Sequence, residues 1–439
     1  MKSIFIKDLK KEASTTLLCW VANKRMGKEN IFLDVYDSTG KVQCFADKNV
    51  ADYSGLKKIN RESCVALVGA LCDFNGQTEF KISDWKMISP STLKISPYPN
   101  EPKFDVLDKK HGNTVITHPT FYIRNKKLAD IFYVKAIFKR QLQDYFWSRG
   151  FIEFEPPTLT RQTLYDDSGA IWLERDGQKL SLSRCATFHL EPAIIPYEKI
   201  FTITNSHADE KVRTNRHLIE YLHMKAEMAW FNLDELVDFA KNMYYEVALK
   251  TYEISKQRFD AVVDPEITKQ KLEKLKPENH KLITYDEAVK ILHENGVEFE
   301  FGKSLTTKQE QILTKHFDES FVWVKYIPYN VEGFMFKRKP DDPKFTMTCD
   351  LIAPCGFGEI LGCAEKMTDY DEVIASMEQK GKMKDFERYK DFAELHKFGL
   401  PPHGGIGMGI ERAVRYLLNI DHVKFLKPFA VIKNSQINH

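Results

Sequence analysis

A proline-rich stretch divides this chain of 439 residues into two parts with different sequence patterns. Pro97, Pro99 and Pro102 fall within eight residues, and proline lacks the backbone N–H that a helix or a central strand requires. The length also favours roughly two or three domains over one. We therefore predict an N-terminal domain over 1–98, a linker over 99–125 and a second domain over 126–439.

The N-terminal part reads as short strands separated by turns. Apolar residues alternate with polar ones between residues 15 and 90, and the turn sequences Ser38-Thr39-Gly40 and Asn75-Gly76 interrupt the pattern. About five antiparallel strands in this length fit a small closed or partly open barrel of the oligonucleotide-binding (OB) type. A generic small β-domain is the alternative.

The second part mixes helices and extended runs without a regular βαβ alternation. Helical spacing covers 130–150 and 234–259, and extended runs lie around 199–208 and 218–230. This order predicts an α+β domain with an antiparallel sheet flanked by helices. The Lys- and Glu-rich segment 254–320 is interpreted as a helical insertion with a solvated charged surface.

Composition excludes several classes of protein. The net charge of +2 gives no overall basic footprint for nucleic acid, and no run of about 18 apolar residues predicts a membrane span. The start of the chain has no apolar signal region, so we expect a cytoplasmic protein. Its eight cysteines are scattered without a CxxC pair, which indicates reduced thiols rather than disulfides or a zinc ribbon.

Glycines at positions 405, 407 and 409 alternate in an extended run near the C-terminus. They remove the side chains from one face of that run, so that a flat ligand could approach closely. Arg412 follows them at the start of a helix, where it could meet a phosphate. The alternative is a glycine-rich turn followed by an ordinary surface arginine.

Two carboxylates precede this motif. Asp350 and Glu359 lie on extended segments separated by a tight turn over 354–358, which would bring them together. Paired carboxylates suit Mg²⁺ that bridges nucleotide phosphates. Salt bridges to nearby lysines are an equally good interpretation of the pair alone.

Three segments together resemble the class II aminoacyl-tRNA synthetases. Residues 402–412 (PHGGIGMGIER) resemble motif 3, residues 150–160 (GFIEFEPPTLT) resemble motif 1, and 201–230 is similar to motif 2 and its loop in the asparaginyl and aspartyl subgroup, the asparaginyl type most of all. The resemblance implies an anticodon-binding OB barrel, a catalytic domain on an antiparallel sheet, a homodimer formed through motif 1, and the use of ATP, Mg²⁺ and tRNA.

The resemblance also implies roles for residues of a nucleotide site. The expected reaction is attack of a carboxylate on the α-phosphate of ATP, which gives an acyl-adenylate and pyrophosphate. The implied roles are adenine binding by Glu210 and Tyr221, contact with the triphosphate by Arg216, His217, Gly409 and Arg412, and Mg²⁺ binding by Asp350 and Glu359.

The chain departs from the family pattern where the acid substrate would bind. Ala208 stands where motif 2 has an arginine that holds the α-phosphate, and Arg184 stands where an uncharged side chain would read the substrate ammonium. Arg184 either replaces the lost arginine or binds an acidic group of a substrate without an ammonium; a surface arginine is the alternative. The same comparison makes His207 a further catalytic candidate and Thr187, Lys366 and His396 further substrate contacts, although either histidine could merely fill space or bond a backbone carbonyl.

Arg25, Phe32 and Gln43 match the barrel residues with which the family reads an anticodon base. Stacking on an aromatic ring combined with hydrogen bonds to the base edge is how OB-folds bind single strands. The alternative is that these residues only pack the barrel.

Three functions follow from these observations. The departures favour a divergent ATP-dependent ligase that activates a carboxylate as an adenylate and passes it to ammonia or an amine. A working synthetase that charges tRNA with asparagine is the first alternative, and an inactive module that binds tRNA or a protein partner is the second. The retained adenine and Mg²⁺ residues argue against the inactive module.

Overall fold

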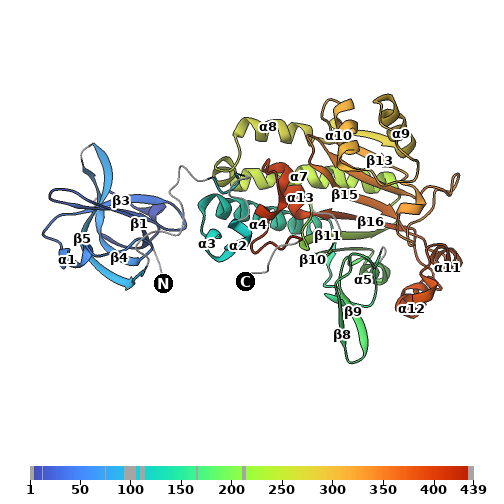
Figure 1. Cartoon of the computed structure of the whole chain (residues 1–439), viewed down its shortest axis with the longest axis horizontal. Coiled ribbons are helices and arrows are strands. Elements are labelled where there is room, and N and C mark those ends of the chain that lie inside the picture. Colours follow the sequence, from blue (N-terminus) through green and yellow to red (C-terminus); the bar gives the residue numbers. More distant parts are fainter. Residues whose placement is uncertain are drawn as a thin grey trace. The chain divides into compact units, whose positions relative to one another are not determined.

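The computed structural model describes residues 4–11, 13–74, 76–92, 105–108, 114–164, 167–209 and 214–433 (Figure 1). The chain forms two compact units, residues 1–104 and 105–439. Glu210, predicted to bind adenine, and Asn75 of the predicted turn lie outside the described residues. None of the described helices is long and apolar enough to cross a membrane.

The N-terminal unit contains a closed five-stranded barrel with strand order β1-β2-β3-β5-β4. Alternation along β2 places Ile31, Leu33 and Val35 in the interior without exposed surface, as a period of two requires. The barrel prediction is confirmed, with one difference: β3 pairs with β5 in parallel, and this pairing closes the barrel. The strands are β1 (Thr15–Met26), β2 (Ile31–Tyr36), β3 (Lys41–Ala46), β4 (Cys64–Phe74) and β5 (Gln77–Ser89), with η1 (Ile6–Asp8) and α1 (Tyr53–Leu56) beside them.

The second unit is built on an eight-stranded sheet with the order β12-β13-β14-β15-β16-β11-β10-β6. The pairings are antiparallel except at the two edges, where β12 pairs with β13 and β6 with β10 in parallel. The predicted α+β class is confirmed, with a mixed sheet in place of a purely antiparallel one. Its strands are β6 (Ile152–Glu153), β10 (Lys199–His207), β11 (Glu220–Ala229), β12 (Lys281–Thr284), β13 (Val322–Lys325), β14 (Thr348–Ala353), β15 (Gly358–Glu365) and β16 (His403–Gly409).

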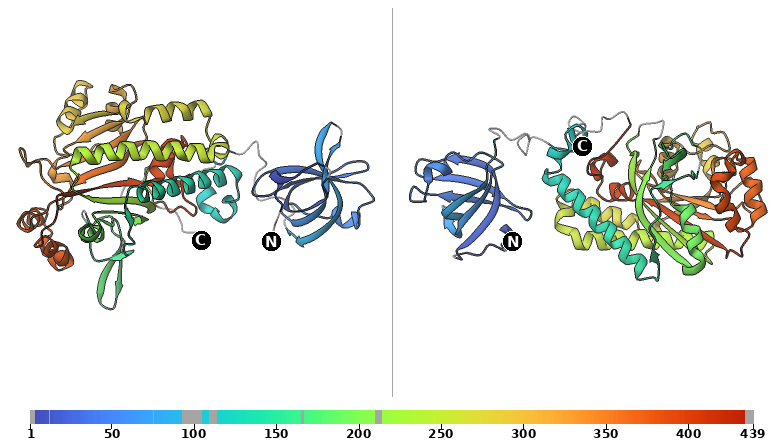
Figure 2. Two further views of the ribbon diagram at one scale, coloured as in Figure 1. Left: turned by 180° about the vertical axis from the view of Figure 1, so that it is seen from behind. Right: turned by 90° about the horizontal axis from the view of Figure 1, so that it is seen from below.

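Two long helices, α4 (Lys126–Trp147) and α7 (Leu233–Asp260), pack on each other, and α7 crosses β14, β15 and β16 (Figure 2). A capping box between Asn232 and Glu235 fixes the start of α7. A shorter helix, α13 (Ile410–Leu417), begins directly at the end of β16.

Smaller elements surround the other face of the sheet. A three-stranded sheet of β7 (Leu159–Thr160), β9 (Gln178–Leu182) and β8 (Trp172–Arg175) is followed by α5 (Thr187–Leu190), η2 (Glu191–Ala193) and α6 (Ile194–Tyr197). The remaining elements here are η4 (Tyr329–Val331), α11 (Tyr370–Gln379), η5 (Met383–Asp385) and α12 (Phe386–Leu395). Near the C-terminus, η6 (Val423–Leu426) instead packs against α4 and α13.

The segment 254–320 differs from the expected solvated insertion. It contains β12, which extends the main sheet, and Tyr285, Ser304 and Glu310 from this segment line the cavity described below. The number of charged residues in the segment does not predict this burial, because Glu310 is buried in an ion pair with Arg216, which lies far away in the sequence. The helical elements are α8 (Pro265–Lys274), η3 (Pro277–Asn279), α9 (Tyr285–Glu294) and α10 (Thr307–His316).

Part of the expected linker is helical. Within 99–125 the structure places α2 (Thr114–Thr117) and α3 (Pro119–Tyr122). Pro119 occupies the first turn of α3, where its missing N–H has no partner in any helix. Proline therefore marks a helix start here rather than excluding a helix.

Candidate active site

A cavity of about 520 Å³ opens on the sheet face opposite α7. Alternation along β11 turns Tyr221, His223, Lys225 and Glu227 towards it, while the intervening Met224, Ala226 and Met228 are fully buried on the other face. Of the predicted site residues, Arg184, Thr187, His217, Tyr221, Asp350, Glu359, Lys366, Gly409 and Arg412 line this cavity.

Glycines on one strand give room to charged side chains of the next. A Cβ at Gly407 would lie 2.5 Å from Lys225 Nζ, and a Cβ at Gly405 would overlap the Glu227 carboxylate. On β15, a Cβ at Gly362 would lie 2.9 Å from Asp350 Oδ1. The predicted glycine face therefore exists, but at positions 405 and 407 it receives protein side chains rather than leaving the surface bare for a flat ligand.

Arg412, the predicted phosphate contact, lines the cavity at the start of α13. Its Nη1 is 3.5 Å from Glu359 Oε1, and its Nε donates to the Arg216 carbonyl at 3.3 Å. Arg216 does not line the cavity itself, because its Nη1 pairs with Glu310 Oε2 at 2.6 Å. Within the described part of the chain its buried Nε has no hydrogen-bond partner.

These cations keep the neighbouring histidines neutral. Burial, together with Arg412 and Arg216, lowers the pKa of His217 to about 3. Burial, Lys225 and Arg412 hold the pKa of His223 well below its ordinary value, and its Nδ1 lies 3.1 Å from Ser206 Oγ. This wall of the cavity therefore offers positive charge to an anion and neutral rings beside it.

A cluster of carboxylates forms the opposite wall. Burial and repulsion from Glu359, Glu332 and Glu310 raise the pKa of Asp350 well above its usual range. Burial raises the pKa of Glu332 to about 7, with a further contribution from Glu359. Such mutual repulsion indicates a place where a cation is favourable.

The carboxylate cluster fits Mg²⁺ in the manner expected from the sequence. Among the described residues no three His, Cys, Asp or Glu side chains are arranged to hold a metal ion. Magnesium usually takes only one or two carboxylates and completes its shell with waters and substrate phosphates. Asp350 and Glu359, on adjacent strands, could supply that pair.

Arg184 lies beside the position left empty by Ala208. A Cβ at Gly169 would lie 3.2 Å from Arg184 Nη2, so the guanidinium rests against this glycine. The backbone N–H of Asp209 donates to the Gly169 carbonyl at 2.9 Å, and Ala208 itself lines the cavity. The fold thus brings the cation of one segment and the alanine of another to the same cavity.

A buried ionic cluster closes the far end of the cavity. Lys366 Nζ lies 3.5 Å from Glu227 Oε1 and 3.8 Å from Glu191 Oε1, and His403 Nε2 lies 3.5 Å from the same Glu191 oxygen. All four side chains are almost completely buried. Lys366 is therefore already paired, so its predicted contact with substrate is shared with two acidic groups.

His207 and His396 do not line the cavity. The Nδ1 of His207 lies 3.3 Å from the Ser183 carbonyl oxygen, and the Nδ1 of His396 lies 2.9 Å from the Phe392 carbonyl oxygen. Each imidazole thus faces a backbone carbonyl in the interior, which is the alternative stated for both residues, and their direct roles stay predictions.

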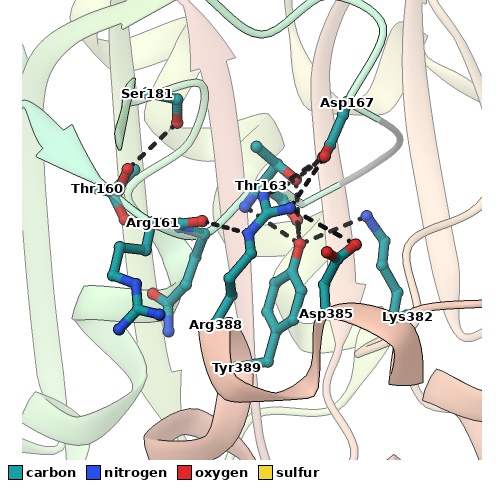
Figure 3. Close-up of polar contacts among 10 residues, drawn as sticks. Thr160, Arg161, Thr163, Asp167, Ser181, Lys382, Asp385, Arg388 and Tyr389 are labelled. Atoms are coloured by element: carbon teal, nitrogen blue, oxygen red, sulfur yellow. Dashed lines mark hydrogen bonds and ion pairs between the residues drawn. The ribbon is translucent and has the colours of Figure 1, made fainter. Parts of the chain in front are cut away.

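A polar network anchors the loop next to the cavity (Figure 3). From α12, Arg388 pairs with Asp167 at 2.9 Å and donates to the Arg161 carbonyl at 2.7 Å. The neighbouring Tyr389 hydroxyl donates to the Thr163 carbonyl at 3.0 Å. Leu164, between these anchors, lines the cavity.

The barrel brings its three predicted RNA-binding residues together. Arg25 and Phe32 face each other across β1 and β2, with the guanidinium carbon 5.9 Å from the ring centre. Arg25 Nη2 donates to Gln43 Oε1, and Gln43 Nε2 donates to Glu79 Oε1. Phe32 is half-buried while Arg25 is exposed, so a base could reach both.

Several residues of the site were not found from the sequence. The sequence pattern could have identified Lys225 and Glu227, since they share one face of a strand that pairs with the strand of alternating glycines. Glu191, Glu310, Glu332 and His403 carried none, because only the tertiary fold brings them to the cavity or its buried end.

Comparison with known proteins agrees with this geometry. A family model described as class II tRNA synthetases (D, K and N) matches residues 112–433, and one described as an OB-fold nucleic acid binding domain matches residues 16–88. The asparagine–tRNA ligase of Pyrococcus abyssi is 31% identical over 440 residues, which cover 98% of each chain. That of Lactobacillus delbrueckii is 27% identical and covers 93% of each chain.

A solved structure shows the same likeness in three dimensions. The asparaginyl-tRNA synthetase of Pyrococcus horikoshii, complexed with asparaginyl-adenylate, superposes with a TM-score of 0.91 at 28% identity and covers 99% of each chain. The predicted OB barrel, the predicted class II catalytic domain after it and the predicted synthetase subgroup are thereby confirmed. The chain belongs to the class II aminoacyl-tRNA synthetases, which are ATP-dependent ligases that form aminoacyl-adenylates.

Proposed function

We propose that this chain activates a small carboxylic acid as an acyl-adenylate and that it does so as a tRNA ligase, with asparagine as the first candidate acid. The observation that carries the proposal is the full-length similarity to asparagine–tRNA ligases, barrel included. The grouping of Arg25, Phe32 and Gln43 on the barrel supports tRNA as the acceptor.

The cavity supports the first step, in which a carboxylate oxygen attacks the α-phosphorus of ATP and pyrophosphate leaves. Negative charge develops on the phosphate oxygens, and fixed cations close to them stabilise that charge. Arg412, which lines the cavity, would supply one such cation, and Arg184, which lines it too, would act where Ala208 cannot. Bound Mg²⁺, held by Asp350 and Glu359, would neutralise charge on the phosphates. In the second step a hydroxyl oxygen of the tRNA attacks the acyl carbon and AMP leaves.

A second candidate is a ligase that passes another acid to ammonia or an amine. Arg184 and Ala208 favour it, because a cation in place of an ammonium-reading group disfavours a free amino acid. The same adenylation step applies, but a nitrogen attacks the acyl carbon. The inactive module of the sequence analysis is a third outcome for the experiment that follows.

The test is pyrophosphate release from ATP and Mg²⁺ with asparagine, aspartate and other carboxylic acids, each with and without total tRNA and ammonia. Release that needs asparagine, followed by its attachment to tRNA, would establish the first candidate. Release with another acid, stimulated by ammonia or an amine and indifferent to tRNA, would establish the second. The Arg412→Ala variant is the control, and no release above that variant with any acid would contradict both.

We also propose a homodimer formed through the motif 1 segment, 150–160. Sedimentation of the purified protein tests it, because a monomer of 51.1 kDa and a dimer differ twofold in mass.

A further inference from the structure

Lys225 is a cation of the cavity wall that no part of the proposed reaction uses. It is half-buried on β11, and within the described residues neither an ion pair nor a hydrogen bond involves its ammonium. Its neighbour along the same face, Glu227, is by contrast paired with Lys366 at 3.5 Å. An unpaired ammonium facing a cavity leaves its charge available to a ligand.

The backbone fixes the direction of this side chain. Lys225 pairs in register with Gly407, and any side chain at 407 would displace its Nζ and Cε. The glycine therefore forms a seat that directs the ammonium along the cavity wall. His223 lies two residues before Lys225 on β11, opposite Gly409 and towards the end of the cavity that Arg412 lines. Glu227 lies two residues after Lys225, towards the closed end of the cavity. Lys225 thus lies roughly 7 Å from either neighbour.

The pKa of a nearby thiol, that of Cys185, indicates positive charge at the same place. Burial by itself would raise the pKa of Cys185, but the Lys225 ammonium, the hydrogen bond with Thr187 and the Lys366 ammonium hold it below its ordinary value. Cys185 also lines the cavity and is adjacent in sequence to Arg184. Two ammonium groups, Lys225 and Lys366, therefore act on Cys185, and Arg184 lines the same cavity. The only acidic group lining this end among the described residues is Glu227, which is paired with Lys366.

We propose that Lys225 and its glycine seat form an anion-binding subsite that holds a second carboxylate of the acid substrate while its first carboxylate is adenylated. The substrate class is a short dicarboxylic acid without a free ammonium, since an ammonium here would face Lys225 and Arg184. The inference rests on the second candidate of the proposed function, whose adenylation step it shares with the first, and it names the class of acid which that candidate would take.

The experiment compares succinate, aspartate and asparagine on the full chain. Binding is measured by calorimetry without ATP, and activation by ATP-dependent pyrophosphate release. We expect succinate to bind and react best. Lys225→Met should weaken succinate binding about 10- to 100-fold, which is the usual effect of losing a hydrogen bond to a charged group. Lys225→Arg should keep most of the affinity, and Lys225→Glu should shift the preference towards an acid with an ammonium.

Lys250→Met, on the exposed face of α7, is the matched control and should leave binding unchanged. A wild-type preference for asparagine, or succinate binding that Lys225→Met does not weaken, would overturn the subsite. If asparagine is activated equally by wild type and Lys225→Met, the subsite fails while adenylation stands. If succinate binds in a Lys225-dependent way but no acid releases pyrophosphate, the subsite stands and the proposed function fails.

Discussion

Replacing Asp350 by asparagine should make the ligand-free protein more stable and at the same time inactive. Asp350 lies among Glu359, Glu332 and Glu310, which together with burial raise its pKa well above its usual range. In the unfolded chain the same carboxyl titrates near pH 3.9. The folded state therefore binds more protons than the unfolded state above that pH, and folding stability falls as the pH rises.

The size of this effect has a ceiling set by pH. At pH 7 a carboxyl that stays protonated in the folded state lowers the free energy of unfolding by at most about 4 kcal/mol, at 1.36 kcal/mol for each pH unit above 3.9. Asp350 is partly accessible to cavity water, which screens the repulsion. We therefore expect Asp350→Asn to add about 1–2 kcal/mol at pH 7, or a few degrees in melting temperature.

Thermal unfolding between pH 5 and pH 8 measures this effect, with Asp391→Asn on the exposed surface of α12 as the control. The gain should grow with pH, and MgATP should stabilise the wild type more than the variant. A variant less stable than the wild type at pH 7, or a gain independent of pH, would refute the reasoning. Asp350 would then be a structural hydrogen-bond acceptor rather than a repelled charge.

The other predictions concern Arg412, Arg388, Phe32 and Cys185. Arg412→Ala should lower ATP-dependent turnover at least about 100-fold, because one fixed charge on the phosphates is lost; full turnover would remove Arg412 from the site. Arg388→Gln should lower stability by about 1–2 kcal/mol and increase amide exchange at 161–170, whereas Arg175→Gln on the exposed β8 should do neither. Phe32→Ala should weaken tRNA binding about 10- to 100-fold without changing tRNA-independent pyrophosphate release, since stacking contributes about 1–3 kcal/mol per base; equal loss of both activities would contradict a barrel confined to RNA binding. Alkylation of Cys185 should begin at a lower pH than that of an ordinary thiol and move to higher pH in Lys225→Met; an unchanged profile would show that Lys225 does not act on the thiol.

Local sequence patterns predicted helices and strands well where the periodicity of apolar residues alone determines the element. Alternation of apolar and polar residues predicted the barrel strands, and helical spacing predicted a helix over 234–259, close to the observed bounds of α7. The pair Asp350 and Glu359 followed from a tight turn between two strands, which is itself a local feature.

Prediction failed where a long-range contact overrode composition. Glu310 belongs to a segment that reads as solvated, yet its pairing with Arg216, 94 positions away, buries it at the cavity. For His207 and His396 the sequence left a direct role and a bond to a backbone carbonyl as alternatives, and in the structure each imidazole faces a nearby carbonyl oxygen in the interior. No property of a single segment distinguishes these cases, because each depends on which segment lies opposite.

The glycines beneath Lys225, Glu227 and Asp350 affect how the charge of this cavity can change in a variant protein. Lys225, Glu227 and Asp350 each lie over a glycine of the next strand, so the sheet backbone beneath them is independent of which charged group stands above it. Exchanging one of these three residues can reverse the sign of charge presented to a ligand without moving a strand. Single substitutions at Lys225 or Glu227 in β11 could therefore change which ligands the cavity prefers, while the glycines of β16 stay the same.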